Sequence, residues 1–327
     1  VLLSVGIACF VYAIEHGNRQ ARVHSFMSGA LLHIESILNE QNDHIRMLRS
    51  AAQASLLNYD RLDIEHIKRN LVQRAEKDLV RGEQEEWYLR HEFNDGVEKQ
   101  GTPSGIGQVD QLSEDVLREL SMVLSLRLPF ERYRSNIPQS GWVYYISKSS
   151  FAMVLPYTKL QDIQFVPEFY ELDLFTFGLP ENNPDGEIRW TRAYPDSFGK
   201  GMMVSLIAPV YRESEFLGTI GVDMTFAELA SYVKTDLFQD YDVAIVDSGD
   251  QVIAHSVITE NPSTGVYTLS SLLSSDEGAK PNIPSDNQFH LFEQQYVLKY
   301  KLTSTPWTLV FLEDVFSWHL SVLLSIT

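Results

Sequence analysis

The feature that most constrains the fold is a long stretch without proline, from Glu15 to about Asn58. Apolar or small residues recur along it mostly every three or four positions, at Phe26, Ala30, Ile34, Ile37, Ile45, Leu48, Ala52 and Leu56. The polar Gln41 fills the one gap in this row. This spacing indicates one long amphipathic helix over 15–58, which at about 1.5 Å per residue would extend roughly 60 Å. Such a helix is either a stalk that transmits displacement and pairs with a second copy, or a helix packed along the chain's own domains.

Both ends of the sequence are apolar. Residues 1–14 contain no charged residue, and the last stretch, from His319 to Thr327, is again apolar. A membrane-spanning helix needs about 20 apolar residues, so each end is expected to be part of a span, with a signal-peptide remnant or a buried terminal segment as the alternative. Two apolar ends around a polar block predict a loop between two spans of the inner (cell) membrane. We therefore expect the intervening residues to be periplasmic.

Charge and cysteine content exclude several functions. The formal net charge of −18 argues against a nucleic-acid-binding surface, which needs clustered Lys and Arg to neutralise phosphates. Cys9 is the only cysteine, so an internal disulfide and a cysteine-based metal site are both excluded.

The pattern is helical first and then changes to strands. Residues 60–128 are highly charged and largely helical in pattern, broken around 101–107, with Ser113 as the N-cap of a helix. Residues 141–156 then predict a β-hairpin, and the turn-rich residues 179–186 predict a loop. Strands are expected at 188–196, 202–211 and 216–224, followed by a helix at 226–233.

The same order then repeats. A second hairpin is expected over 241–255, followed by a short helix at 269–274 and strands at 288–292, 295–302 and 307–312. Two such units predict an α+β fold with two PAS-like antiparallel-sheet modules. The expected boundaries are 1–14 for a truncated transmembrane helix, 15–58 for the stalk helix, 59–235 for the first module with a helical insertion, 236–316 for the second module, and 317–327 for the start of a second transmembrane helix.

Three segments of the first module carry a family resemblance: Trp190–Asp196, Met203–Tyr211 and Phe216–Asp223. Together with the order span, long helix, two modules and span, they resemble the double Cache family of extracytoplasmic sensor domains of bacterial transmembrane receptors. The resemblance implies that the first module is membrane-distal and holds a pocket for a small polar ligand, and that the second is membrane-proximal. It also implies that this region is not an enzyme and has no cofactor. The stalk helix makes a homodimer the expected assembly.

The candidate ligand-binding residues are Tyr144, Trp190, Arg192, Tyr194 and Asp223. On a continuous strand, Trp190, Arg192 and Tyr194 would share one face, offering an aromatic plate, a guanidinium and a phenol. Asp223, at the end of an apolar strand, would accept from an ammonium or a hydroxyl group. The alternatives are core packing for Trp190 and Tyr194, and capping of the helix at 226–233 for Asp223.

Relatives in this family that bind amino acids carry a longer signature. Tyr194 and Asp223 match its last two positions, 29 residues apart. The arginine and the Trp–Tyr pair expected upstream are replaced here by Phe175–Pro180. The carboxylate clamp of an amino-acid site is thus missing at its expected place, and Arg189 or Arg192 is a candidate substitute.

The sequence carries no recognisable catalytic signature. The nine histidines include no zinc-type pair, and neither a nucleophile elbow nor a phosphate-binding loop is present. The oxygen-rich residues 181–186 lack the spacing of a calcium loop and indicate a turn. We therefore expect no catalytic residue and no metal in this region. The resemblance around Trp142–Tyr145 and Gly178–Pro184 favours a cytoplasmic diguanylate cyclase as the output, with a sensor histidine kinase of a two-component system next and a chemoreceptor third. A structural or protein-binding ectodomain is the alternative from another class.

Overall fold

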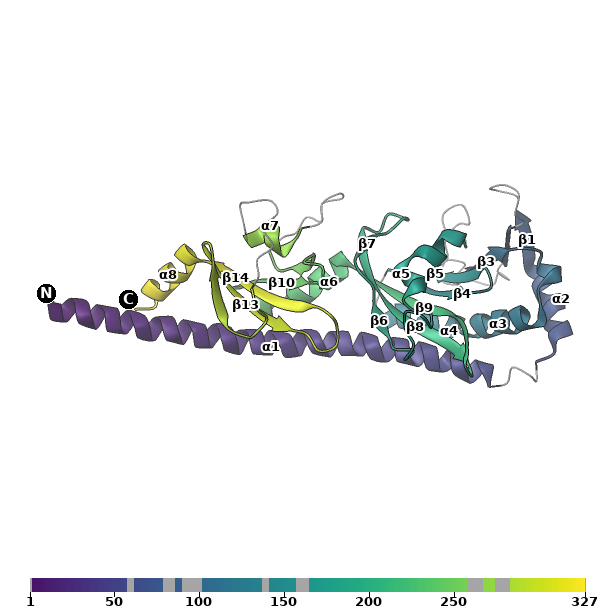
Figure 1. The fold of residues 1–327 in the computed structure, drawn as a ribbon, viewed down its shortest axis with the longest axis horizontal. Coiled ribbons are helices and arrows are strands. Elements are labelled where there is room, and N and C mark those ends of the chain that lie inside the picture. The colour runs from purple at the N-terminus through teal and green to yellow at the C-terminus, as the bar shows by residue number, and fades with distance from the viewer. Residues whose placement is uncertain are drawn as a thin grey trace. The chain divides into compact units, whose positions relative to one another are not determined.

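The structure is a computed structural model that describes residues 2–57, 62–78, 86–89, 102–136, 141–156, 165–257, 267–273 and 283–326. They form two compact units, each built on an antiparallel sheet (Figure 1). The first-sheet unit comprises Gln41–Thr225, and the second-sheet unit comprises Val1–Glu40 with Phe226–Thr327. The predicted α+β class, a long N-terminal helix followed by two antiparallel-sheet modules, is confirmed.

The long helix is α1 (Leu2–Leu56). Six members of the predicted apolar row are buried: Ala30, Ile34, Ile45, Leu48, Ala52 and Leu56. The other two, Phe26 and Ile37, are half-buried, and the buried face is completed by Val23, Met27 and Leu38. Gln41, the polar gap in the row, is buried too, and its Oε1 accepts a hydrogen bond of 2.9 Å from the Tyr133 hydroxyl. The helix therefore packs along the chain's own modules, one of its two predicted roles.

Among the described residues, no helix is both long enough and apolar enough to cross a membrane.

The first sheet has the strand order β1-β2-β3-β5-β4-β9-β8-β6, with β7 also paired to β8. The predicted hairpins at 141–156 and 202–224 are confirmed as β4/β5 and β8/β9, and Ser113 caps α3 as expected. The strands are β1 (Ala75–Asp78), β2 (Glu86–Leu89), β3 (Thr102–Ile106), β4 (Val143–Ser147), β5 (Phe151–Leu155), β6 (Arg189–Trp190), β7 (Tyr194–Pro195), β8 (Met202–Arg212) and β9 (Glu215–Thr225). The helices of this unit are α2 (Ile64–Arg74), α3 (Glu114–Ser125), α4 (Arg127–Asn136) and α5 (Asp173–Thr176), together with the last part of α1.

The largely helical pattern expected over 60–128 is wrong in part, because β1, β2 and β3 extend the sheet there. The segment read as a break, 101–107, contains β3. Gly105 belongs to that strand because of close packing: a Cβ atom on it would lie 2.6 Å from Cζ2 of Trp87 and 2.8 Å from Cβ of Phe151. A glycine required by a close approach looks in sequence like a glycine required by a turn.

The two faces of the first sheet serve different purposes. Strand β4 alternates, so Tyr145 lies on the face that carries α3, where its hydroxyl donates to Oε1 of Glu119 at 2.7 Å. Burial raises the pKa of Glu119 to about 7. Trp142, Tyr144 and Ile146 lie on the opposite face, where they join the apolar cluster that surrounds the candidate site.

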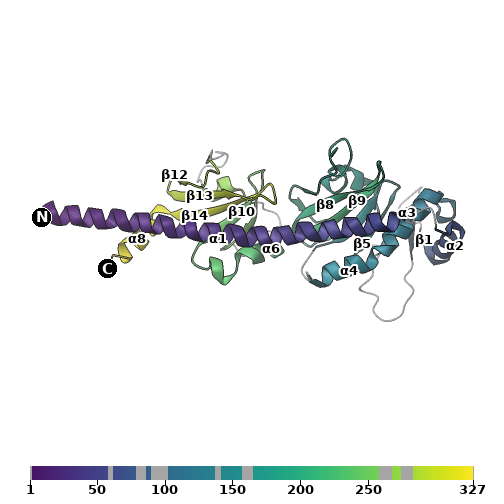
Figure 2. The same ribbon diagram turned by 90° about the horizontal axis from the view of Figure 1, so that it is seen from below.

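The second sheet has the order β11-β10-β14-β13-β12. Its elements are α6 (Phe226–Val233), β10 (Asp242–Val246), β11 (Val252–His255), α7 (Leu269–Leu273), β12 (Phe289–Phe292), β13 (Gln295–Lys301), β14 (Thr308–Asp314) and α8 (Val315–Leu324). The predicted second hairpin and the three strands after it are confirmed. Figure 2 shows the first part of α1 running beside this sheet.

Gly29 offers a test of how α1 is packed. It lies within the helix, and a Cβ atom added to it would meet nothing within 4 Å. Because alanine in a helix interior is about 0.5–1 kcal/mol more favourable than glycine, Gly29→Ala should raise the free energy of unfolding by that amount. Urea denaturation followed by circular dichroism measures it. A loss of stability would contradict the open surroundings of Gly29.

Candidate functional site

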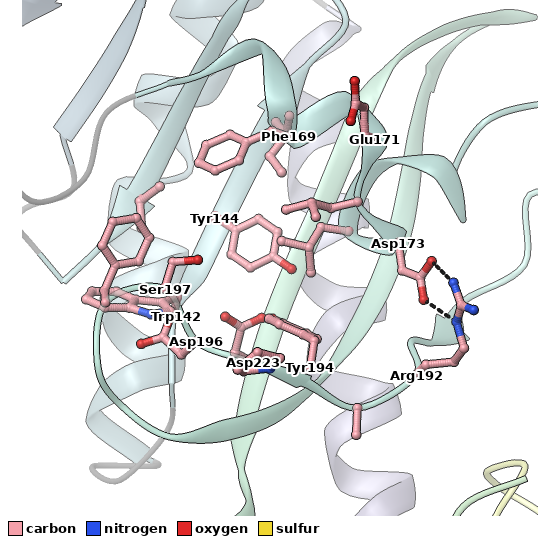
Figure 3. A pocket seen from close by; sticks show the side chains of 17 residues that line it. Trp142, Tyr144, Phe169, Glu171, Asp173, Arg192, Tyr194, Asp196, Ser197 and Asp223 are labelled. Carbon is pink, nitrogen blue, oxygen red and sulfur yellow. Dashed lines mark hydrogen bonds and ion pairs between the residues drawn. The ribbon is translucent and has the colours of Figure 1, made fainter. Parts of the chain in front are cut away.

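A cavity of about 570 Å³ opens on the sheet face that carries Trp142, Tyr144 and Ile146 (Figure 3). Strands β4, β5 and β9 form its floor, and the segments 169–174 and 192–198 form its sides. The residues that line it are Trp142, Tyr144, Ile146, Val154, Phe169, Glu171, Leu172, Asp173, Leu174, Arg192, Ala193, Tyr194, Pro195, Asp196, Ser197, Phe198 and Asp223. Most of this lining is apolar or aromatic, with a few polar groups, as is usual for small-molecule sites.

A chain of hydroxyl groups ends on the Asp223 carboxylate. Asp223 in β9 lies directly opposite Ser205 in β8, so both side chains point to the cavity face. The Ser205 hydroxyl donates to Oδ1 of Asp223 at 2.6 Å, and the Tyr194 hydroxyl lies 2.7 Å from Ser205 Oγ. The hydroxyl of Tyr144 points into the same group (Figure 3).

Asp223 is a buried carboxylate, and among the described residues it accepts a hydrogen bond from the hydroxyl group of Ser205. Its exposed fraction is 2%, and burial raises its pKa to about 7, against the opposing effect of the Ser205, Tyr144 and Tyr194 hydroxyls. Among the described residues no lysine, arginine or histidine forms an ion pair with it. Burial and the charge of Asp223 also raise the pKa values of Tyr144 and Tyr194, so both phenols are neutral donors. The group is prepared to accept a hydrogen bond from a cation or a hydroxyl.

The loop from Asp196 to Gly201 closes one side of the cavity around Trp142. The Trp142 indole N–H donates to Oδ1 of Asp196 at 3.1 Å, and the backbone N–H of Lys200 donates to its Oδ2 at 2.8 Å. The Lys200 ammonium lies 3.6 Å from the centroid of the Trp142 ring and donates to the Gly141 carbonyl at 2.8 Å. The Lys200 ammonium therefore lies against the face of the Trp142 ring, and Lys200 is not among the residues that line the cavity.

Arg192 is bound at the rim of the cavity. Its Nε and Nη2 donate to the two carboxylate oxygens of Asp173 at 2.9 and 2.8 Å, a bidentate pair. The pairing raises the pKa of Arg192. In Figure 3 the guanidinium lies on the far side of the Asp173 carboxylate from Tyr144.

The structure brings together four of the five predicted ligand-binding residues: Tyr144, Arg192, Tyr194 and Asp223 all line the cavity. Trp190 is buried and is not among the lining residues. The Asp223 carboxylate bonds within the sheet, where it accepts from Ser205.

The continuous strand expected over 188–196 is wrong. It is two short pieces, β6 and β7, interrupted at 191–193. Ser205 N–H donates to the Thr191 hydroxyl at 2.9 Å, so a side chain replaces a carbonyl in the ladder at this point. Strict alternation is lost there, and the expected shared face of Trp190, Arg192 and Tyr194 does not form.

Several residues that line the cavity were not predicted from the sequence. Trp142 could have been found, because alternation along β4 places it on the same face as Tyr144. Asp196 could also have been found, because it ends the Trp190–Asp196 segment that carries the family resemblance. Asp173 and Phe169 carry no signal that links them to residues some 20 to 50 positions later.

Metal binding has no visible basis in the described ranges, since no three His, Cys, Asp or Glu side chains gather closely enough to hold an ion.

Solved structures similar to this chain include ligand-binding domains of chemoreceptors. The ligand-binding domain of Mlp24 with asparagine is 15% identical, covers 93% of this chain and 98% of its own, and gives a TM-score of 0.47. That of the Pseudomonas aeruginosa amino-acid chemoreceptor PctC with GABA is 15% identical, covers 86% and 95%, and gives 0.46. That of Campylobacter jejuni Tlp3 with L-norvaline is 14% identical, covers 88% and 94%, and gives 0.42. No protein-family model and no curated protein sequence matches the chain.

Proposed function

We propose that the chain is the extracytoplasmic sensing region, of the double Cache type, of a transmembrane signalling receptor, and that it binds a small polar ligand in the cavity of the first-sheet unit. The observation that carries the proposal is the buried Asp223 carboxylate, which faces a cavity of about 570 Å³ without a cation partner among the described residues. Cavities that hold small molecules usually measure about 300–1,000 Å³.

The residues suggest how a ligand would be held. An ammonium or hydroxyl group of the ligand would donate to Asp223, and the phenols of Tyr144 and Tyr194 would surround it. Trp142 and Phe169 would cover its apolar part. This arrangement supports small-molecule sensing over a structural or protein-binding ectodomain, which would need an apolar surface without a cavity at this place.

Signalling would follow from differential affinity. A ligand shifts a receptor only if it binds two arrangements of the sensor with different affinities. We propose that the receptor sits in the inner membrane with this region in the periplasm, and that it is a homodimer through α1. We further propose a cytoplasmic diguanylate cyclase as the output, with a histidine kinase as the alternative, on the resemblance at Trp142–Tyr145 and Gly178–Pro184. Ligand-dependent cyclic di-GMP synthesis by the full-length receptor would support the first, and ligand-dependent autophosphorylation the second.

A thermal-shift screen of the purified chain tests the ligand-binding proposal. The probes are amines, polyamines, amino acids, organic acids and purines. A true ligand at about 100 times its Kd adds roughly 2.7 kcal/mol to the free energy of unfolding. Tyr194→Ala should remove this stabilisation, because it deletes a phenol that lines the cavity and bonds to Ser205. If a probe stabilises the wild type and Tyr194→Ala equally, the cavity is not its site.

A further inference from the structure

The cavity has a marked excess of negative charge. Of the described residues that line it, Glu171, Asp173, Asp196 and Asp223 are acidic, and Arg192 is the single basic one. Asp196 already accepts from the Trp142 indole and the Lys200 backbone. Among the described residues that line the cavity, Arg192 is therefore the side chain that could receive an anionic group directly.

Arg192 already forms an ion pair with the carboxylate of Asp173. Its Nε and Nη2 both donate to Asp173, whose side chain is 18% exposed, whereas that of Arg192 is 78% exposed. The half-buried Asp173 carboxylate thus holds the exposed Arg192 guanidinium at the rim. Arginine recognises carboxylates through this same two-pronged contact, so Asp173 occupies the position that a ligand carboxylate would take.

A ligand carboxylate would have to compete with Asp173 at a disadvantage. An internal group competes at an effective concentration that is of the order of millimolar or higher. A ligand carboxylate would also be repelled by Glu171, Asp196 and an ionised Asp223, whereas an ammonium group would be attracted by all three. Selection against one ligand class by an unfavourable charge is as effective as selection for another.

We propose that Asp173 is a specificity-determining residue: by holding Arg192 it removes carboxylate recognition from the cavity, so that the ligand is an amine without a carboxylate group. This inference rests on the proposed function, because it names the ligand class of the same cavity. It assigns Arg192 a different role from the one expected in the sequence, since the guanidinium serves as the partner of Asp173 and does not contact the ligand.

Matched probe pairs test the proposal. Each pair consists of an amine and the amino acid that differs from it by one carboxylate: isoamylamine and L-leucine, phenethylamine and L-phenylalanine, agmatine and L-arginine. Isothermal titration calorimetry on the wild-type chain should show binding of at least one amine and much weaker binding of its amino acid. In Asp173→Asn the amino acid should gain about tenfold or more in affinity, as expected for one charged hydrogen-bonded contact, while the amine changes little.

Three variants make the result specific. Asp173→Asn combined with Arg192→Gln should lose the gain for the amino acid, because the released guanidinium is then absent. Arg192→Gln alone should not weaken amine binding, because it removes a positive charge from the rim and leaves the Asp173 carboxylate unpaired there. Glu215→Gln is the matched control, because it disturbs ion pairs with Lys148 and Arg212, none of whose members lines the cavity. It should leave the affinities for both members of every probe pair unchanged.

The outcomes separate this inference from the proposed function. If no probe of any class binds the wild type, the proposed function fails. If an amine binds but Asp173→Asn brings no gain for its amino acid, the inference is overturned and the proposed function stands. Loss of amine binding in Arg192→Gln, or wild-type binding of an amino acid more tightly than its amine, also overturns it. Should Asp173→Asn not fold, the Arg192→Gln result and the wild-type preference decide the question.

Discussion

Asp223→Asn is expected to abolish the ligand response and, at neutral and alkaline pH, to stabilise the unliganded chain. The carboxylate is the acceptor that we assign to the ligand's ammonium group, and a buried charge-assisted hydrogen bond of this kind is worth about 2–5 kcal/mol. The Kd of an amine ligand should therefore rise about thirtyfold or more. Asparagine retains the size of the side chain and an oxygen that accepts from Ser205, so the fold should persist.

The stabilisation follows from proton linkage. The folded pKa of Asp223 is about 7, and an unfolded aspartate has a pKa of about 3.9. The folded state binds the Asp223 proton more tightly than the unfolded state does. This contribution to the free energy of unfolding is fully present below about pH 4 and is lost as the pH rises to about 7. Because asparagine does not titrate, the free energy of unfolding of Asp223→Asn relative to wild type should increase by about 1.4 kcal/mol per pH unit across this window. Urea denaturation of both proteins at pH 4.5, 6 and 8 measures the difference.

The same linkage predicts how affinity depends on pH. A bound ammonium favours the ionised form of Asp223, so amine binding should release a proton and tighten as the pH rises from 5 to 8. Calorimetry in buffers of different ionisation enthalpy measures the released proton. In Asp223→Asn any residual binding should show no such release.

Glu119 provides a matched control for Asp223. It is equally buried, its pKa is also raised to about 7, and it lies on the other face of the sheet, bonded to Tyr145. Glu119→Gln should reproduce the pH-dependent gain in stability and leave ligand affinity unchanged. If both variants lose binding equally, the loss reflects the unit as a whole and our assignment of Asp223 is wrong.

Sequence periodicity predicted the sheets because it is a local property. The β4/β5 and β8/β9 hairpins could be predicted from runs of β-branched and aromatic residues separated by turn residues, and α1 from its helical spacing. Where a strand depends on a distant partner, the sequence was insufficient. Gly105 is explained only by the Trp87 ring beside it, and the break at Thr191 only by its hydrogen bond to Ser205.

The candidate site shows the same limit. Tyr144, Tyr194 and Asp223 follow from strand pattern and family resemblance, and the structure places them at one cavity. The commitment of Arg192 to Asp173 could not be predicted, because these residues lie 19 positions apart on different local elements. A guanidinium can bind a ligand carboxylate only if its N–H groups are not already bonded to another carboxylate. Whether they are bonded depends on the folded chain.

Gly221→Ala is expected to displace Tyr144 and to weaken both the fold and the site. Gly221 in β9 lies directly opposite Tyr144 in β4, and the phenol ring covers it. A Cβ atom on Gly221 would lie 2.2 Å from both Cε2 and Cζ of Tyr144 and 2.4 Å from its hydroxyl oxygen. The ring is buried and borders the cavity, so the added methyl group must push it away from Gly221 toward the space proposed for the ligand. Insertion of a methyl group into such a core costs about 1–3 kcal/mol, and amine affinity should fall because the phenol leaves the Asp223 group.

A double-mutant cycle isolates this contact. Leucine at position 144 lacks the three atoms that an alanine side chain at 221 would meet, so Gly221→Ala should cost less in a Tyr144→Leu background than in the wild type. The expected coupling free energy is about 1–2 kcal/mol, measured from urea denaturation of the four proteins. Equal costs in the two backgrounds would show that the glycine is required for its backbone and not for the ring. Tyr144→Phe, which keeps the ring and removes the hydroxyl, should preserve the stability and lower only the affinity for the amine. An unchanged stability together with a lower affinity is expected only if the Tyr144 hydroxyl is part of the ligand site.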